Sequence, residues 1–170
     1  MRKTVLVFGL ISGAISTGMM AVTLPLLGTT IDWGRAEVFG YTALVLSALV
    51  VFFGIRSYRE GVGASRITFG RGFAVGLLIT LIASACYVAA FQVIYFKLTP
   101  DFGEKFTAAM VDQARASGAS PEKIEETARR AQGYKRIYDN PLTNAGLTFL
   151  EPFPIGLVVT AISAAILRKR

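Results

Sequence analysis

The chain has 170 residues, of which 53% are hydrophobic and only 17% charged, whereas soluble domains carry roughly 25% charged residues. No charged residue lies between Lys3 and Asp32 or between Arg71 and Lys97, so these stretches lack the polar face that a soluble helix or strand needs. The net charge is +7, but the basic residues stand at the edges of apolar runs. That placement is typical of a membrane protein and argues against nucleic-acid binding.

The side chains used in most catalytic and metal sites are scarce. The sequence has no histidine, which removes the usual general base and the commonest metal ligand. Its single cysteine, Cys86, lies inside an apolar run, where cysteine usually behaves as a small hydrophobic residue. Nucleophile chemistry of the Ser–His and Cys–His kinds is therefore excluded. We expect no catalytic residues, no cofactor and no metal, and we predict that the protein is not an enzyme.

Four apolar runs are long enough to cross a bilayer about 30 Å thick, which takes roughly 20 helical residues. They are residues 4–27, 38–55, 73–96 and 147–167. The first run ends at Pro25 and Gly28, and it is too long for the apolar core of a typical cleavable signal peptide. The second run is short, but the flanking Arg56 and Arg59 can extend to the interface.

The basic flanks of the four runs predict their orientation. Basic residues precede the first run, separate the second from the third, and follow the fourth. They are Arg2 and Lys3, then Arg56, Arg59, Arg66 and Arg71, and finally Arg168, Lys169 and Arg170. The connection after the first run instead holds Asp32 and Glu37 against Arg35. We therefore expect a multi-pass protein of the bacterial inner (cytoplasmic) membrane with both termini in the cytoplasm.

Residues 97–140 form the only sizeable aqueous segment between the runs, and its pattern predicts an outer helical hairpin. One helix is expected to end at Gly118, and Ser120 with Pro121 is typical of the start of a second helix. We expect Pro141 to end this segment. The hairpin is interpreted as a cap that packs on the bundle. The alternative is a docking site for an envelope protein.

Small residues recur at four-residue spacing in the apolar runs, a pattern that lets helices approach closely. The glycines that we assign to helix packing are Gly9, Gly13, Gly72, Gly76 and Gly156. The pattern predicts a tight four-helix transmembrane bundle, and it is equally compatible with contacts between two copies of the chain.

Glu151 is the polar residue that the membrane tolerates least. A span beginning after it would run only from Pro154 to Leu167, about 21 Å, so we expect Glu151 to enter the membrane region. One interpretation is a helix cap, because a carboxylate before two prolines is typical of a helix start, and Glu37 would act similarly. The other is a polar pocket for an ion, a proton or a small amphiphile, formed by Glu151, Gln92 and Glu37 with Tyr41 nearby.

Several ordered motifs resemble one family of bacterial membrane proteins, the domain of unknown function 4199 family. The motifs are Glu37-Val-Phe-Gly40-Tyr41, Gly54-Ile-Arg56-Ser-Tyr58-Arg59, Ile67-Thr-Phe69-Gly70-Arg71-Gly-Phe73, Asn140-Pro141-Leu142 and Glu151-Pro152-Phe153-Pro154-Ile155-Gly156-Leu157. The resemblance covers nearly the whole chain. It implies a four-span inner-membrane protein without an established activity, so it assigns no catalytic residues.

Together these patterns predict an all-α polytopic membrane protein that forms a single membrane domain over residues 1–170. The function we expect is that of a small structural or accessory component of the inner membrane. Its expected partners are the lipid bilayer and either a second copy of the chain or an envelope protein, and not nucleic acid. The alternative function is a transporter or an ion- or lipid-handling protein that uses an outer-leaflet polar cluster around Glu151.

Overall fold

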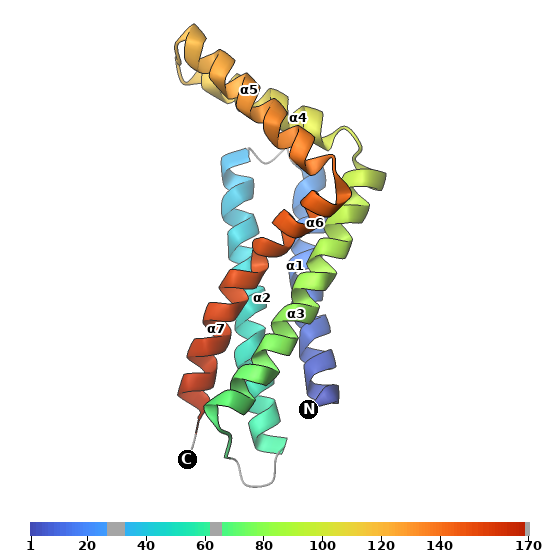
Figure 1. Cartoon of the computed structure of the whole chain (residues 1–170), viewed down its shortest axis with the longest axis vertical. Helices are drawn as coiled ribbons and strands as arrows, with labels where there is room; N and C mark the ends of the chain where they lie inside the picture. The colour runs from blue at the N-terminus through green and yellow to red at the C-terminus, as the bar shows by residue number, and fades with distance from the viewer. Residues whose placement is uncertain (27–32, 62–65, 169–170) are drawn as a thin grey trace. The chain divides into compact units, whose positions relative to one another are not determined.

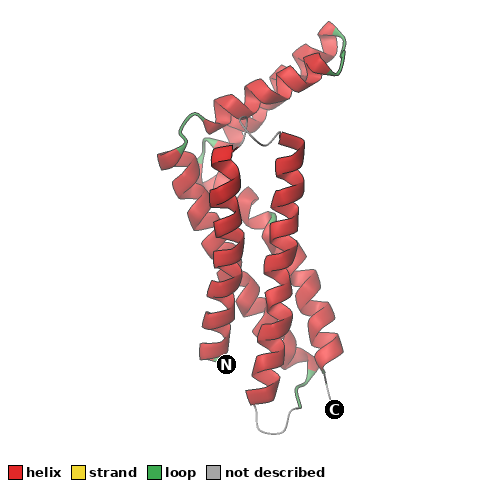
Figure 2. Cartoon of the chain, turned by 180° about the vertical axis from the view of Figure 1, so that it is seen from behind, coloured by secondary structure: helices red, strands yellow, loops and turns green. Residues whose placement is uncertain are grey.

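The computed structural model describes residues 1–26, 33–61 and 66–168, and the regular structure in these ranges is helical (Figure 2). In chain order the elements are α1 (Arg2–Leu26), α2 (Trp33–Gly61), α3 (Phe69–Val93), the π-helix η1 (Ile94–Leu98), α4 (Phe102–Ala116), α5 (Pro121–Tyr138), α6 (Pro141–Leu150) and α7 (Pro152–Leu167) (Figure 1). The expected stop at Gly28, the side chains of Arg35 and Glu37, and Lys169 and Arg170 lie outside the described part.

Four stretches of the described chain are long and apolar enough to cross a membrane. They are Arg2–Leu24, Val38–Gly61, Phe69–Leu98 and Pro141–Leu167. The all-α class, with four apolar helices and a helical hairpin between the third and the fourth, is therefore confirmed. The second helix continues past Ile55 through Arg56 and Arg59, because arginine is a good helix former and its long side chain reaches polar surroundings from within a helix.

The chain divides into two compact units. The first comprises Met1–Ala90 and Thr148–Arg170, and the second comprises Phe91–Leu147. The expected single membrane domain stays a prediction.

In the first unit α1, α2, α3 and α7 form a bundle in which α2 lies beside both α1 and α7 (Figures 1 and 2). Helix α3 closes the bundle through close contacts at glycines. A Cβ atom added to Gly9 of α1 would lie 2.8 Å from Cβ of Ile82 on α3. One added to Gly156 of α7 would lie 2.5 Å from Cγ2 of Thr80 on α3. These distances are far below ordinary carbon–carbon contact. The helices can approach this closely only because glycine has no side chain.

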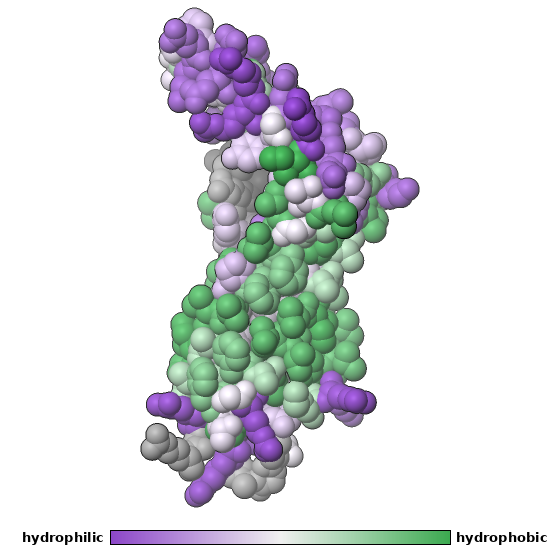
Figure 3. Space-filling view, viewed as in Figure 1, coloured by the Kyte–Doolittle hydropathy of each residue, from purple (hydrophilic) through white to green (hydrophobic). Residues whose placement is uncertain are grey.

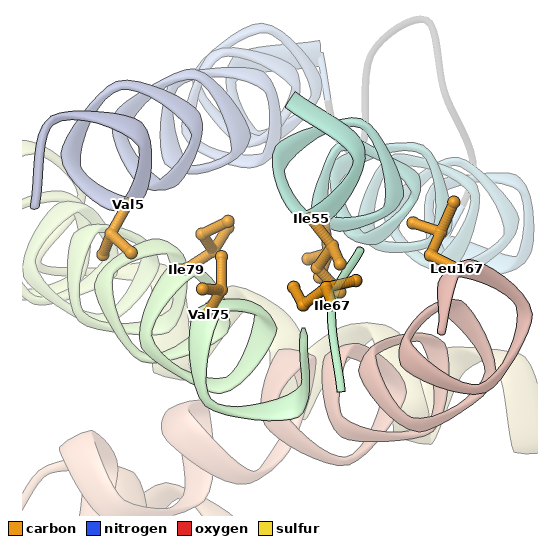
Figure 4. Close-up of a cluster of buried hydrophobic side chains, with 7 residues drawn as sticks. Val5, Ile55, Ile67, Val75, Ile79 and Leu167 are labelled. Atoms are coloured by element: carbon orange, nitrogen blue, oxygen red, sulfur yellow. The ribbon is translucent and has the colours of Figure 1, made fainter. Parts of the chain in front are cut away.

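The bundle has a small apolar core and a large apolar exterior. Seven buried side chains form one cluster inside the four-helix unit (Figure 4): Val5, Val51, Ile55, Ile67, Val75, Ile79 and Leu167. The outer faces of the helices are also apolar, as the green surface of the four-helix unit shows (Figure 3). Leu10, Phe53 and Ile162 are each more than half exposed. An apolar exterior of this extent is expected of a protein whose solvent is lipid.

In the second unit α4 and α5 pack side by side as a hairpin. Gly118 in the turn has a φ of 72°, a left-handed conformation that glycine adopts without the steric penalty of a side chain. The side chain of Ser120 accepts a hydrogen bond of 3.3 Å from the backbone N–H of Lys123, and Pro121 is the first residue of α5. The stop at Gly118 and the start at Ser120 and Pro121 that the sequence predicts are both confirmed.

Aromatic side chains hold the base of this hairpin. The rings of Phe91, Tyr95, Phe102 and Tyr138 pack with centroids 5.8–6.4 Å apart. Tyr95 is buried and lies in η1, where the helix widens to the π form. Such π turns change the direction of the following side chains, so η1 contributes to the orientation of the aromatic group.

Candidate functional site

Glu151 lies at the break between α6 and α7. Pro152 follows it, and a proline ring lacks the N–H that would continue the helical hydrogen bonds and collides with the carbonyl four residues earlier. Helix α7 alone has 16 residues and spans about 24 Å at 1.5 Å per residue. Because this is short of a bilayer core of about 30 Å, the fourth crossing needs residues of α6 and carries Glu151 within it.

The carboxylate of Glu151 does not cap α7. The residue itself is helical, with φ −72° and ψ −60°, and its side chain makes no capping hydrogen bond. Instead its Oε2 accepts a hydrogen bond of 3.1 Å from the hydroxyl of Tyr87 on α3. The interpretation of this side chain as a cap is therefore wrong. Pro152 and Pro154 carry no backbone N–H, so they offer no donor to a capping side chain at residue 151.

Gln92, the second member of the expected polar cluster, has partners in the second unit. Its Nε2 donates to the carbonyl of Pro141 at 3.0 Å and to Oδ1 of Asn144 at 3.2 Å. Asn144 is 0% exposed, and its Nδ2 donates to the carbonyl of Tyr138 at 2.9 Å. These bonds connect the end of α3 with the start of α6 and the end of α5. Gln92 is therefore hydrogen-bonded within this unit, and its membership of a polar pocket stays a prediction.

For the other two members of the expected polar cluster, Tyr41 and Glu37, the structure gives no contact with Glu151 among the described residues. Tyr41 on α2 is 55% exposed. The side chain of Glu37 lies outside the described residues. Whether these residues form a pocket with Glu151 stays a prediction. Among the described residues, no three histidine, cysteine, aspartate or glutamate side chains gather as a metal site.

Pro141 was interpreted only as the end of the expected aqueous segment. It is also the first residue of α6, so the fourth apolar stretch begins at residue 141 and not near residue 147. Oδ1 of Asn140 accepts from the backbone N–H groups of Leu142 at 3.0 Å and of Thr143 at 3.3 Å. An asparagine followed by proline is a helix-start signal, so the sequence contained the information that the fourth apolar helix begins here.

Tyr95 and Asp139 form a second polar contact of the hairpin base. The hydroxyl of Tyr95 donates to Oδ1 of Asp139 at 2.9 Å, and Nζ of Lys135 lies 2.9 Å from Oδ2. The Lys135 ammonium lowers the pKa of the Asp139 carboxyl, and the Tyr95 hydroxyl lowers this pKa further while partial burial opposes both. Gly103 leaves room for this contact, because a Cβ there would lie 2.8 Å from the Tyr95 hydroxyl.

The glycines assigned to helix packing all lie where helices meet. A Cβ on Gly13 would lie 2.7 Å from Cβ of Cys86, and one on Gly76 would lie 2.7 Å from Cγ2 of Thr160. A Cβ on Gly72 would lie 3.4 Å from Cβ of Ala164. Gly9 and Gly156 have the contacts with α3 given above. Their importance for stability stays a prediction that substitution can test.

Hydroxyl pairs cross the bundle interior, and sequence reasoning found their residues only in part. Ser12 of α1 and Ser47 of α2 each donate to the other's backbone carbonyl at 2.8 Å. Thr80 of α3 and Thr160 of α7 have hydroxyl oxygens 3.2 Å apart. Ser47, Thr80 and Thr160 each stand four residues after another small residue and so belong to the four-residue spacing seen in the sequence. Ser12 lies beside Gly13, outside that spacing, and was missed. Tyr87 was also missed, although a tyrosine inside an apolar run needs a partner for its hydroxyl.

The chain thus combines four long apolar helices, an apolar outer face, and an interior of glycines and paired hydroxyls. This combination defines a polytopic α-helical membrane protein. The profile of the family described as protein of unknown function (DUF4199) matches residues 7–169, so the chain belongs to that family. The resemblance seen in the sequence motifs is confirmed, and the match includes the hairpin. No curated protein and no solved structure matches the chain.

Proposed function

We propose that the protein is a non-enzymatic structural or accessory component of the bacterial inner membrane, with both termini in the cytoplasm, and that it associates with a second copy of itself. The observation that carries the structural role is the interlocked interior of the four-helix unit. At Gly54, Gly76 and Gly156 even one added carbon would come within 2.5–2.7 Å of a neighbouring side chain. An interior packed in this way favours a role as a rigid structural element of the membrane over a role as a path for solutes.

Self-association is supported by the surroundings of Glu151. The residue is exposed on the four-helix unit although it lies inside an apolar stretch. Its Tyr87 partner supplies one hydrogen bond. A carboxylate at depth in a membrane costs a few kcal/mol on insertion scales, and donors from a second copy would reduce that cost. The orientation is supported by the basic residues that flank the apolar helices.

Association can be measured with fluorescently labelled full-length protein in liposomes of decreasing protein density. We expect energy transfer between labels to persist on dilution and to fall for Glu151→Ala. Glu60→Gln is a matched control, because Glu60 is a carboxylate of α2 whose Oε1 lies 2.9 Å from Nε of Arg56. A wild-type protein that is monomeric at every density, and that co-purifies with nothing in mild detergent, would contradict the proposal.

A second candidate function is the handling of an ion, a proton or a lipid at Glu151. One observation favours it. The Glu151 carboxylate lies within an apolar stretch and accepts a hydrogen bond from the Tyr87 hydroxyl, and no salt bridge to this carboxylate is found among the described residues. Such a group is a functional-site hypothesis by default. In proteoliposomes that contain a pH-sensitive dye, wild-type flux that is lost in Glu151→Gln and kept in Glu60→Gln supports this function. Absence of flux in the wild type removes it.

A further inference from the structure

One end of the four-helix unit is strongly basic, as the purple side chains near the termini show (Figure 3). The basic residues described there are Arg2, Lys3, Arg56, Arg59, Arg66, Arg71 and Arg168. The carboxylate described at this end is Glu60, and its Oε1 is engaged by Nε of Arg56 at 2.9 Å. The end therefore presents a surplus of positive charge to any anion that approaches.

Arg59 differs from the other basic residues in its burial. It lies one helical turn after Ile55, which is 0% exposed, so both side chains project from the inward face of α2. Its Nη1 donates to the backbone carbonyl of Leu167 at the end of α7, over a long distance of 3.4 Å. Its Nε is buried and has no hydrogen-bond partner in the part of the chain that the structure describes.

A role as a helix cap explains only part of this geometry. A cation beside the last carbonyls of a helix is favourable, and the bond from Arg59 to Leu167 fits that role. A guanidinium has five N–H donors in a planar fork, however, and a buried donor without a partner destabilises the fold. The unpaired Nε is left over from the capping role and indicates an acceptor that the described residues do not supply.

We propose that Arg59 binds the phosphate of an anionic phospholipid at this end of the bundle. Nε and one Nη of an arginine lie in parallel and match two oxygens of a phosphate. Because the bond to Leu167 is long, the guanidinium can turn from it at low cost and present Nε. Arg168 follows Leu167 directly and is exposed, so it adds positive charge beside the same phosphate.

The position of Arg59 favours a lipid as the source of that phosphate. Arg59 lies one helical turn after Ile55 and donates to the carbonyl of Leu167, and both of these residues belong to the buried apolar cluster. It therefore lies where the apolar cluster meets the basic end of the unit. Headgroup phosphates lie at this boundary, and basic pockets between helices at the cytoplasmic side are typical sites for anionic headgroups. The apolar outer faces next to it accommodate the acyl chains. Free inorganic phosphate has the same chemistry but gains nothing from these faces.

The test is native mass spectrometry of the full-length protein in a neutral detergent, titrated with phosphatidylglycerol or with phosphatidylcholine. We expect selective retention of phosphatidylglycerol by the wild type. Arg59→Gln should weaken the apparent affinity by about tenfold or more, since it removes charge-assisted hydrogen bonds to the phosphate together with the charge. Arg66→Gln removes the same charge from an exposed position before α3 and should weaken it by about fivefold at most, the contribution of one basic residue at an anionic surface.

Three outcomes would overturn the proposal. The first is equal loss in the two variants, which indicates diffuse attraction without a site. The second is retention without preference for the anionic lipid. The third is displacement of phosphatidylglycerol by inorganic phosphate, which makes free phosphate the ligand. If Arg59→Gln does not fold, Arg59→Lys decides the question, because lysine keeps the charge and lacks Nε. Weakened retention in that variant supports the site, and unchanged retention contradicts it.

Discussion

The contact between α1 and α3 at Gly13 gives a sharp test of how this bundle is stabilised. In Gly13→Ala the new methyl carbon would lie 2.7 Å from Cβ of Cys86 and 3.1 Å from its Sγ. Favourable carbon–carbon contact begins at about 3.5 Å, so α1 and α3 must separate by roughly 1 Å. Cβ of Cys86 is fixed to its backbone, and no change of rotamer can relieve the overlap.

The expected cost follows from two contributions. Overpacking of a well-filled interior costs about 1–3 kcal/mol. Movement of α1 also strains the 2.8 Å bonds between Ser12 and Ser47, and hydrogen bonds between membrane helices contribute about 0.6 kcal/mol on average. Because alanine is also the better helix former by up to about 1 kcal/mol, we expect Gly13→Ala to lower the free energy of unfolding by about 1–2 kcal/mol in total.

Gly18→Ala provides the control on the same helix. Gly18 also lies inside α1, and a Cβ there would meet nothing within 4 Å. Its replacement should leave stability unchanged or raise it by up to about 1 kcal/mol, since alanine is the better helix former. Unfolding by dodecyl sulfate in mixed micelles, followed by circular dichroism, measures both variants. Equal stability of Gly13→Ala and Gly18→Ala would refute the inference that α1 and α3 touch at Gly13.

Two further predictions concern polar contacts. Ser47→Ala removes the hydrogen bond that the Ser47 hydroxyl donates to the carbonyl of Ser12 on α1. It should lower the unfolding free energy by about 0.6–1.7 kcal/mol in the same assay, and no change would indicate that this bond is not formed in the membrane. Acid should loosen the hairpin base, because contact with Lys135 lowers the pKa of Asp139 below its unfolded value. The stabilisation is present above the unfolded pKa and is lost as the pH falls through the folded one. The protection of amides at the end of α5, relative to the intrinsic exchange rate at each pH, should therefore fall at low pH in the wild type and less in Asp139→Asn, and an equal fall in both would contradict the assignment.

Much of the fold follows from patterns that are local in the sequence. Hydropathy over about 20 residues predicts the four apolar helices, because the bilayer imposes both length and composition. The hairpin was predictable from Gly118, Ser120 and Pro121, since each determines its own backbone conformation. The start of the fourth apolar helix at Pro141 was equally local, but its signal was assigned to the end of a segment.

The candidate site depended on contacts between distant residues. The sequence places Glu151 before two prolines, which favoured a cap, yet its partner is Tyr87, 64 positions away. Ser12 and Ser47 are 35 positions apart, and only the helix rotations align their hydroxyls. The unpaired Nε of Arg59 depends likewise on where α7 ends. Such pairings are set by helix rotation and depth, which a hydropathy pattern does not contain.

The hydrogen bonds between Ser12 and Ser47 have a consequence for the synthesis and membrane insertion of the protein. Ser12 belongs to α1 and Ser47 to α2, which leave the ribosome before α3 and α7, and chains generally fold from the N-terminal side during synthesis. Reciprocal bonds between these two helices need no residue made later. The nascent chain can thus insert as a paired helical hairpin, and α3 and α7 can be added to a template in which Ser12 and Ser47 are already hydrogen-bonded.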